Sequence, residues 1–375
     1  MEYVTLKEVC KIKMGQSPDS SSYNDVKEGI PFFQGNADFG ERYPIPRVWC
    51  NAPKKIAESG DILISVRAPI GALNYAKDKC CIGRGVAAIT PDENKVVSEF
   101  VYWLLKSKKD ELNTKGTGST FKAIGRKVLE GTMLPNFDKN KQYKCVEVLE
   151  KTYSVIQKKK QELKLFDELI KARFVEMFGD MVINPNKWKK ALLGEICDVR
   201  DGTHDSPKYF AEGYPLVTSK NVTGGKIDFS DCSLICEEDY NKINKRSKVD
   251  RGDILMPMIG TVGNPIIVDI EAKFAIKNVA LIKFKEESEV INKFIKVLFE
   301  SEYFDRTVIS KVRGGTQRFI SLGDIRKLEV CLPPIELQNQ FADFVHQVDK
   351  SKVAVQKALD EAQLLFDSLM QEYFG

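Results

Sequence analysis

The chain has 375 residues, of which 43% are hydrophobic and 29% charged, and its formal net charge is +4. Its length predicts two or three domains, with two as the first choice, and its composition is typical of a soluble globular protein. It has no apolar run of roughly 20 residues and no signal-peptide pattern at its start, so we expect a cytoplasmic protein without a membrane partner. Nine cysteines without a C-x-x-C pair indicate neither a disulfide framework nor a zinc knuckle.

Two halves of the sequence carry the same segments in the same order. Residues 6–15 (LKEVCKIKMG) match residues 193–202 (LGEICDVRDG), with leucine, glutamate, cysteine and glycine in register. The further matches, in chain order, are 29–31 with 213–215, 60–63 with 252–255, 84–87 with 277–280, 118–121 with 316–319, 134–135 with 332–333 and 166–169 with 366–369. One such match could arise by chance, but a series in one order indicates a duplication.

Each half begins with a predicted globular domain. Residues 1–138 and 188–335 mix short β-branched runs with glycine, proline and asparagine turns. This pattern predicts two similar α/β domains with several irregular strands.

Each domain is followed by a helical segment, residues 139–187 and 336–375. Both segments are rich in Lys, Glu, Gln, Leu and Ala, which predicts a helix over 139–179, followed by a linker, and a second helix over 336–374. Apolar residues recur every three or four positions along both helices, which is the pattern of a coiled-coil seam.

These helices would be about 55–60 Å long, which is longer than a small domain is wide. Each must bury its apolar stripe, and the other helix is the obvious partner. We therefore predict an α+β fold in which two similar α/β domains are joined by two long antiparallel coiled-coil helices, with pseudo-twofold symmetry. Lys160 and Asp167 interrupt the first stripe, where they either set the register of the pair or lie where a partner protein packs.

The sequence lacks the residue patterns of an enzyme. Its two histidines, His204 and His346, are not in a metal-ligand spacing with Cys, Asp or Glu. The phosphate-binding patterns G-x-x-x-x-G-K-[ST] and G-x-G-x-x-G are missing, as is the Asn/Asp-Pro-Pro-aromatic tetrapeptide of amino-methyltransferases. We expect a non-catalytic chain that binds no cofactor and no metal itself.

Basic residues gather at matching places, between residues 106 and 127 and between residues 305 and 327. A basic run is most often a solvated face, but its recurrence with a glycine-rich polar turn in both halves favours a DNA-binding role. Backbone N–H groups and hydroxyls of such turns suit phosphate oxygens, while Lys, Arg and Gln can reach base edges. The candidates are Lys115, Thr117, Ser119, Thr120 and Lys122 in the first half, and Arg313, Thr316, Gln317 and Arg318 in the second.

A second set of candidates follows the first glycine turn of each half. Gln16 and Ser17 follow Gly15, and Thr203 and His204 hold the matching positions. The remaining candidates are three cations, Arg67, Arg84 and Lys277. For the arginines a surface ion pair is an equally good interpretation, and for His204 an ordinary loop position is a better one.

This duplicated arrangement resembles the specificity subunits of type I restriction–modification systems along the whole chain. The resemblance lies in the paired openings LKEVC and LGEIC, the Gly-Asp-Ile-Leu strand starts, and the turns GTGSTFKAIGRKVLEGTMLP and GGTQRFISLGDIRKLEVCLPPIELQ. The helix ends FDELIKARFVEMFG and FDSLMQEYFG belong to the same pattern.

The resemblance implies two target recognition domains, 1–138 and 188–335, held apart by two spacer helices, and a bipartite target in double-stranded DNA. It also implies two methyltransferase subunits as partners, and restriction subunits with motor and nuclease activity that can join them. S-adenosylmethionine, ATP and Mg would belong to these partner subunits. Because the two domains have diverged, the two half-sites should differ in sequence.

Two alternatives remain open at this point. The chain could be the recognition portion of a fused methyltransferase-nuclease. It could also be a coiled-coil scaffold whose globular ends bind proteins, which predicts no salt-dependent affinity for DNA.

Overall fold

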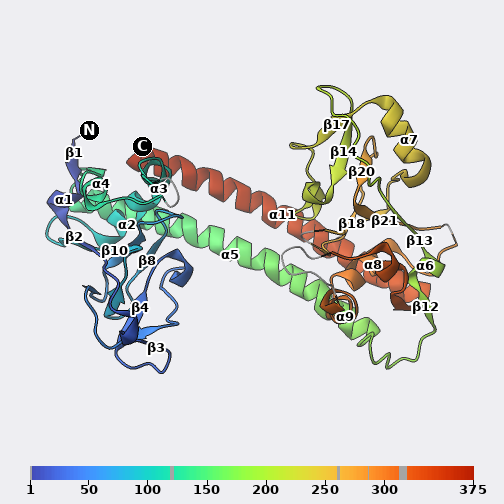
Figure 1. Ribbon diagram of the computed structural model, residues 1–375, viewed down its shortest axis with the longest axis horizontal. Coiled ribbons are helices and arrows are strands. Elements are labelled where there is room, and N and C mark those ends of the chain that lie inside the picture. The colour runs from blue at the N-terminus through green and yellow to red at the C-terminus, as the bar shows by residue number, and fades with distance from the viewer. Residues whose placement is uncertain (1, 119–121, 260–261, 286, 312–318) are drawn as a thin grey trace. The chain divides into compact units, whose positions relative to one another are not determined.

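The computed structural model describes all residues except 1, 119–121, 260–261, 286 and 312–318 (Figure 1). The chain divides by its contacts into two compact units, unit 1 with residues 1–160 and 356–375 and unit 2 with residues 161–355. Each unit takes in part of both long helices, so its limits are set by packing and not by chain order. Within the described residues no helix is both long enough and apolar enough to span a membrane.

Each unit is built on a four-stranded antiparallel sheet. In unit 1 the strand order is β2 (Cys10–Met14), β10 (Val86–Pro91), β7 (Ile62–Ser65) and β8 (Leu73–Tyr75). In unit 2 the order is β13 (Asp198–Asp201), β21 (Val279–Lys283), β18 (Ile254–Pro257) and β19 (Ile266–Ile267). The strands β7 and β18 are short, largely apolar runs buried on both faces, as expected for strands that are covered on both sides.

A second sheet in each unit contains a parallel strand pair. In unit 1 its order is β3 (Tyr23–Asn24), β5 (Trp49–Cys50), β4 (Ile30–Phe33), β9 (Cys80–Ile82) and β6 (Ile56–Ala57). In unit 2 its order is β17 (Ser233–Ile235), β14 (Tyr214–Thr218) and β20 (Ala275–Lys277). The pair β4–β9 in unit 1 matches the pair β14–β20 in unit 2, and both are parallel. The predicted duplication of one mixed α and β fold is therefore confirmed.

Short elements complete the units. Unit 1 contains β1 (Tyr3–Thr5), β11 (Met133–Pro135), α1 (Leu6–Val9), η1 (Ser20–Ser22), η2 (Asn36–Asp38), α2 (Ser98–Ser107), α3 (Lys109–Thr114) and α4 (Arg126–Glu130). Unit 2 contains β12 (Lys190–Leu192), β22 (Glu329–Cys331), α6 (Leu193–Ile196), η3 (Ser219–Asn221), β15 (Val222–Thr223), β16 (Lys226–Ile227), α7 (Glu237–Ser247), α8 (Asn292–Phe299), α9 (Glu302–Thr307), η4 (Ile309–Lys311) and α10 (Leu322–Arg326).

The first and last strands of each globular part correct one predicted match between the halves. β1 pairs with β11 and β12 pairs with β22, both antiparallel, and these ladders make Leu134 correspond to Val330. Both side chains are buried, at 1% and 0% exposed. The predicted match of residues 134–135 with residues 332–333 is wrong by two residues, because the second Leu-Pro pair lies beyond β22 at the entry to the following helix.

The two predicted long helices are present. α5 (Lys139–Phe178) and α11 (Ile335–Phe374) each have 40 residues (Figure 1). The Asp138 carboxylate accepts a hydrogen bond from the backbone N–H of Lys141 at 2.9 Å and so caps the start of α5. α5 ends before Gly179, whose φ of +70° suits the left-handed conformation that commonly terminates a helix.

Within each unit the two helices lie side by side and run in opposite directions. In unit 1, Tyr153 packs against Phe366 with ring centroids 5.9 Å apart. In unit 2, Asp167 pairs with Lys352 at 2.5 Å, and Phe178 packs against Phe341 at 5.4 Å. Residue numbers rise along α5 as they fall by the same steps along α11, so the predicted antiparallel pairing is confirmed.

The helix ends show where the two helices correspond. Phe374 packs on Phe100 of α2, with ring centroids 5.1 Å apart. Phe178 packs on Phe294 of α8 in the same way, at 5.0 Å. The ends of the helices therefore match each other, and the predicted match of residues 166–169 with 366–369 is displaced by one helical turn. Such a slip escapes sequence reasoning because it keeps the same face of the helix.

Candidate nucleic-acid interface

In unit 1, backbone hydrogen bonds bring most of the predicted DNA-binding residues to one end of the four-stranded sheet. Gly15 N–H donates to Val86 O at 2.9 Å, and Val66 N–H donates to Gly85 O at 2.9 Å. Ala68 N–H donates to Lys122 O at 3.0 Å. The segments joined in this way carry Gln16, Ser17, Arg67, Arg84, Thr117 and Lys122.

These side chains are available for a ligand. Arg67, Arg84 and Lys122 are exposed, and none of them has an ion pair within the described part of the chain. Ser17 is tied in more closely, because its Oγ accepts a hydrogen bond from the backbone N–H of Arg84 at 3.3 Å. Three free cations at one sheet end form a surface suited to phosphate oxygens and base edges.

Other basic residues of the same run have structural partners. Lys115 pairs with Glu111 at 2.6 Å. Lys106 packs over Tyr153, with its Nζ 4.0 Å from the ring centroid. Lys108 Nζ donates to Phe374 O at 2.8 Å. The local excess of positive charge in the sequence therefore overstates the charge that is free to bind DNA.

Close backbone contacts add Gln34 to this surface. A Cβ on Gly85 would lie 2.1 Å from Gln34 O, so only glycine fits at this position. Gln34 is exposed and follows β4 directly. Its backbone N–H donates a hydrogen bond to the Asp38 carboxylate at 2.7 Å, which closes the turn that comes next. Sequence reasoning missed Gln34, although the polar stretch after an apolar strand was a usable signal.

Unit 2 repeats the arrangement with different side chains. Gly202 N–H donates to Val279 O at 3.1 Å, and Thr203 N–H donates to Ile276 O at 2.9 Å. Thr203 bridges to Lys277, so these two candidates lie side by side. Lys277 Nζ also donates to the Ser206 hydroxyl at 2.7 Å.

His204 is part of a polar network at the same sheet end. Its Nε2 lies 2.7 Å from Asp201 Oδ2, and its Nδ1 lies 2.8 Å from Asn278 Oδ1. Arg246, at the end of α7, donates to the other oxygen of Asp201. His204 itself is 64% exposed, so the network presents the ring at the surface. Asn278 and Arg246 were not predicted as part of the site.

Several predicted residues of the two glycine-rich turns fall outside the part of the chain that the structure describes. Ser119, Thr120, Arg313, Thr316, Gln317 and Arg318 lie outside the described residues. The bridges of Ala123 to Arg67 and of Phe319 to Ile259 make Phe319 correspond to Ala123, which displaces the predicted match of 118–121 with 316–319 by two residues. The same bridges place Ile259 where unit 1 has Arg67, so the two units differ in charge at this position.

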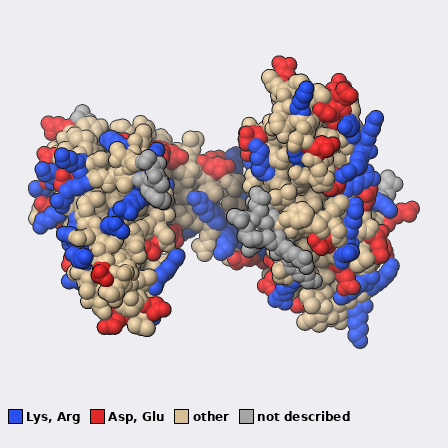
Figure 2. All heavy atoms as spheres, in the orientation of Figure 1, with Lys and Arg blue, Asp and Glu red and all other residues tan. Residues whose placement is uncertain are grey.

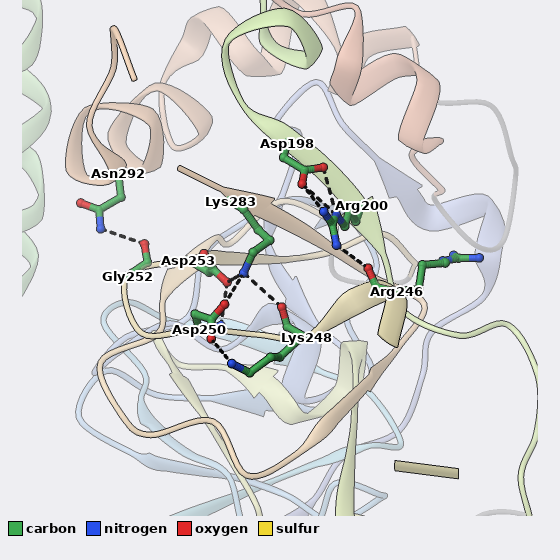
Figure 3. A network of polar contacts seen from close by, with 9 residues as sticks. All are labelled: Asp198, Arg200, Arg246, Lys248, Asp250, Gly252, Asp253, Lys283 and Asn292. Atoms are coloured by element: carbon green, nitrogen blue, oxygen red, sulfur yellow. Dashed lines mark hydrogen bonds and ion pairs between the residues drawn. The ribbon is translucent and has the colours of Figure 1, made fainter. Parts of the chain in front are cut away.

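A half-buried ionic cluster joins the strands of unit 2 at the end of the sheet opposite to Asp201 and Thr203 (Figure 3). Lys283 of β21 donates to Asp253 at 2.5 Å and to Asp250 at 2.9 Å. Its bond to Asp250 lowers the pKa of that carboxyl group, whereas burial raises the pKa of Asp253. In unit 1 a hydroxyl takes the place of the ammonium group, since the Thr90 hydroxyl donates to Asp61 at 2.6 Å.

Arg200 of β13 forms a second ion pair of this cluster and also links its strand to the end of α7. Arg200 donates to the Asp198 carboxylate at 2.8 Å, and this bond lowers the pKa of Asp198 (Figure 3). Arg200 also donates to Arg246 O at 2.7 Å. The cluster thus holds the last residues of α7 against the strand that leads to His204.

Within the described residues, no group of three His, Cys, Asp or Glu side chains is placed to hold a metal ion. Burial raises the pKa of Cys10, Cys80 and Cys197 to about 12, so these thiols stay protonated at neutral pH and are poor nucleophiles.

On the face shown in Figure 2, Lys and Arg are interleaved with Asp and Glu, so charge alone does not delimit the interface.

Relatives in sequence cover different shares of the chain. The chain is 50% identical over 125 residues to the putative type I restriction enzyme MjaX specificity subunit of Methanocaldococcus jannaschii, a match that covers 33% of this chain and only 29% of that relative. It is 21% identical to the type I restriction enzyme EcoBI specificity subunit of Escherichia coli over 98% of this chain and 83% of the relative.

A solved structure and a family model also cover most of the chain. The type I restriction-modification system S subunit from M. genitalium is 14% identical, with a TM-score of 0.56 over 100% of this chain and 96% of that one, which shows the shared fold. Residues 1–165 and 185–362 match the family model described as the type I restriction modification DNA specificity domain. With both halves matched, in the order in which the two units repeat their fold, the chain belongs to the family of type I restriction–modification specificity subunits.

Proposed function

We propose that this chain is the sequence-reading subunit of a type I restriction–modification complex, in which each unit reads one part of a bipartite DNA target. The observation that carries the proposal is that both units build the same sheet end from the same backbone contacts but equip it with different side chains. Arg84 in unit 1 corresponds to Lys277 in unit 2, and Ser17 corresponds to His204. A shared scaffold with diverged side chains is what two readers of unlike half-sites require.

We further propose that catalysis belongs to partner subunits. The chain would dock two methyltransferase subunits, which supply S-adenosylmethionine, and a restriction subunit that uses ATP and Mg could join them. The sequence relatives are named as subunits of restriction enzymes, and one structural neighbour comes from work on complex assembly of the type I R-M system. The absence of methyltransferase and phosphate-binding patterns supports the same division of labour.

The experiment that tests this function is genome-wide methylation mapping in a host that carries the methyltransferase subunit, with and without this chain. We expect methylation at one interrupted, asymmetric sequence only when the chain is present. Methylation that is unchanged by the chain would contradict the proposal. If the chain were instead a protein-binding scaffold, the purified chain should show no salt-dependent affinity for duplex DNA.

A further inference from the structure

The turn between β20 and β21 contains Asn278 in an unusual backbone conformation. Its φ of +53° lies in the left-handed region, which is costly for most residues and best tolerated by glycine and asparagine. The turn is also closely held, since Asn278 N–H donates to Thr203 O at 3.3 Å and Asn278 O accepts from the Ser219 hydroxyl at 3.1 Å. The backbone at this position is therefore set by contacts on both sides.

The side chain of Asn278 is held as well. Its Oδ1 lies 2.8 Å from His204, and His204 is held in turn by Asp201 at 2.7 Å. Asp201 is only 13% exposed and is fixed from its other oxygen by Arg246. The contacts thus run from Arg246 through Asp201 and His204 to the amide of Asn278. This amide is half-buried, next to Lys277 in the chain and close to Thr203.

Holding a surface amide in this way lowers the entropy that a ligand contact would cost. The Nδ2 group of Asn278 has no hydrogen-bond partner among the residues that the structure describes, and Oδ1 has a second lone pair. One free donor beside one acceptor on the same amide complements the N7 acceptor and the N6 amino donor of adenine in the major groove.

Unit 1 cannot use this position in the same way. Counted back from the strands β10 and β21, Lys277-Asn278 corresponds to Arg84-Gly85, and a Cβ on Gly85 would lie 2.1 Å from Gln34 O. No side chain fits there without moving the backbone. The two units therefore differ at this position because unit 1 has no space for a side chain there, and not only because the residue types differ.

We infer that Asn278, positioned by His204, is a specificity-determining residue of unit 2 that reads an adenine, and that unit 1 has no counterpart to it. This inference rests on the proposed DNA-reading function and names a residue pair within it. His204 is a positioning residue, because it acts through the Asn278 amide.

The test is selection of bound sequences from a random duplex DNA library, with the full chain in complex with its methyltransferase. For Asn278→Gly we expect a bipartite consensus in which one adenine-containing base pair, in one half-site only, loses preference by tenfold or more, as expected for a lost bidentate contact. His204→Ala should weaken the preference at the same base pair, and the double variant should lose no more than Asn278→Gly.

The control variant is Asn264→Gly in the same unit. Asn264 also has a positive φ, of +51°, but lines a depression together with Asp349 and Lys352 of α11. This variant should keep the parent consensus. Glycine accepts both backbone conformations, so both variants should still fold, and thermal unfolding of each variant checks this.

A parent-like consensus from folded Asn278→Gly would overturn the inference while leaving the proposed function intact. A change spread over both half-sites would also overturn it. If the parent complex itself selects no consensus, the proposed function fails, and the inference fails with it.

Discussion

At the scale of single residues, the partners of a cation decide whether it can bind DNA. Lys122 and Lys115 look alike in the sequence, seven positions apart in one basic run, yet among the described residues only Lys115 has an acidic partner, Glu111. The backbone carbonyl of Lys122 accepts a hydrogen bond from Ala68 N–H, and the Lys122 side chain is exposed. The free cations, and not the net charge of the run, define the candidate surface.

Replacing Lys122→Glu should therefore weaken DNA binding by about 1–3 kcal/mol at fixed salt, and reduce the dependence of the binding constant on salt. Binding of a duplex that carries the mapped target can be measured by fluorescence anisotropy at several salt concentrations. The matched control is Lys77→Glu. The neighbouring Ala76 accepts a hydrogen bond from Gly60, at the end of β7 opposite to Arg67, so the control should bind like the parent. Equal affinities for all three proteins would remove the site assignment.

Lys106 provides a second prediction at this scale, on stability. Burial against Trp103 and Tyr153 lowers the pKa of Lys106 from 10.5 to about 8. Between pH 8 and 10.5 the unfolded chain then binds a proton that the folded chain does not. The contribution of Lys106 to stability is therefore most favourable above pH 10.5 and falls as the pH falls through this window.

Lys106→Met removes this proton linkage and keeps the packing volume. We expect the variant to be more stable than the parent by about 1 kcal/mol at pH 7, because an apolar isostere avoids the cost of burying a charge. The advantage should shrink between pH 8 and pH 10. Urea unfolding of both proteins at several pH values measures the difference, and an advantage independent of pH would contradict the assigned cause.

At the scale of elements, one buried glutamine ties each long helix to its globular part. Gln142 Oε1 accepts the backbone N–H of Val97 at 2.8 Å, at the start of α2. Gln338 accepts the N–H of Ile291, at the start of α8, at 3.1 Å. The two glutamines are 3% and 0% exposed. Both also donate to a carbonyl just before their own helix, so the same brace occurs in both units.

Gln142→Leu should destabilise unit 1 by about 1–3 kcal/mol, because it leaves buried backbone groups without partners. Hydrogen exchange followed by mass spectrometry should show faster exchange in the peptide that contains Val97. Gln338→Leu is the matched variant and should increase exchange around Ile291 instead. If either variant affected both regions equally, the brace would not be a local device.

At the scale of the whole molecule, both long helices contribute residues to both units. If the pair sets the gap between half-sites, lengthening both helices should lengthen the gap. One heptad inserted after Gln157 in α5 and another after Ala362 in α11 keeps the apolar stripes in phase and adds about 10 Å. At about 3.4 Å per base pair, the mapped methylation target should gain about three base pairs in its gap. An unchanged gap would end the spacer role.

The sequence by itself determined the duplication, the mixed α and β fold of each half and the two long helices, because these depend on local patterns of apolar residues, glycine and proline. The antiparallel pairing followed from the need of both helices to bury one stripe. The glycine turns in the sequence also predicted Gln16, Ser17, Thr203 and His204 as candidates. Shared backbone contacts place the first two and the last two at matching positions in the two units.

Only the tertiary structure decided the register between the halves, because shifts of two residues or of one helical turn change no local pattern. It alone separated free cations from committed ones, since Lys106 and Lys108 have partners that lie far away in sequence. It also revealed Gln34 and Asn278, which reach the interface through contacts that join distant segments of the chain. Side-chain availability is a property of long-range packing, and a linear pattern carries no direct record of it.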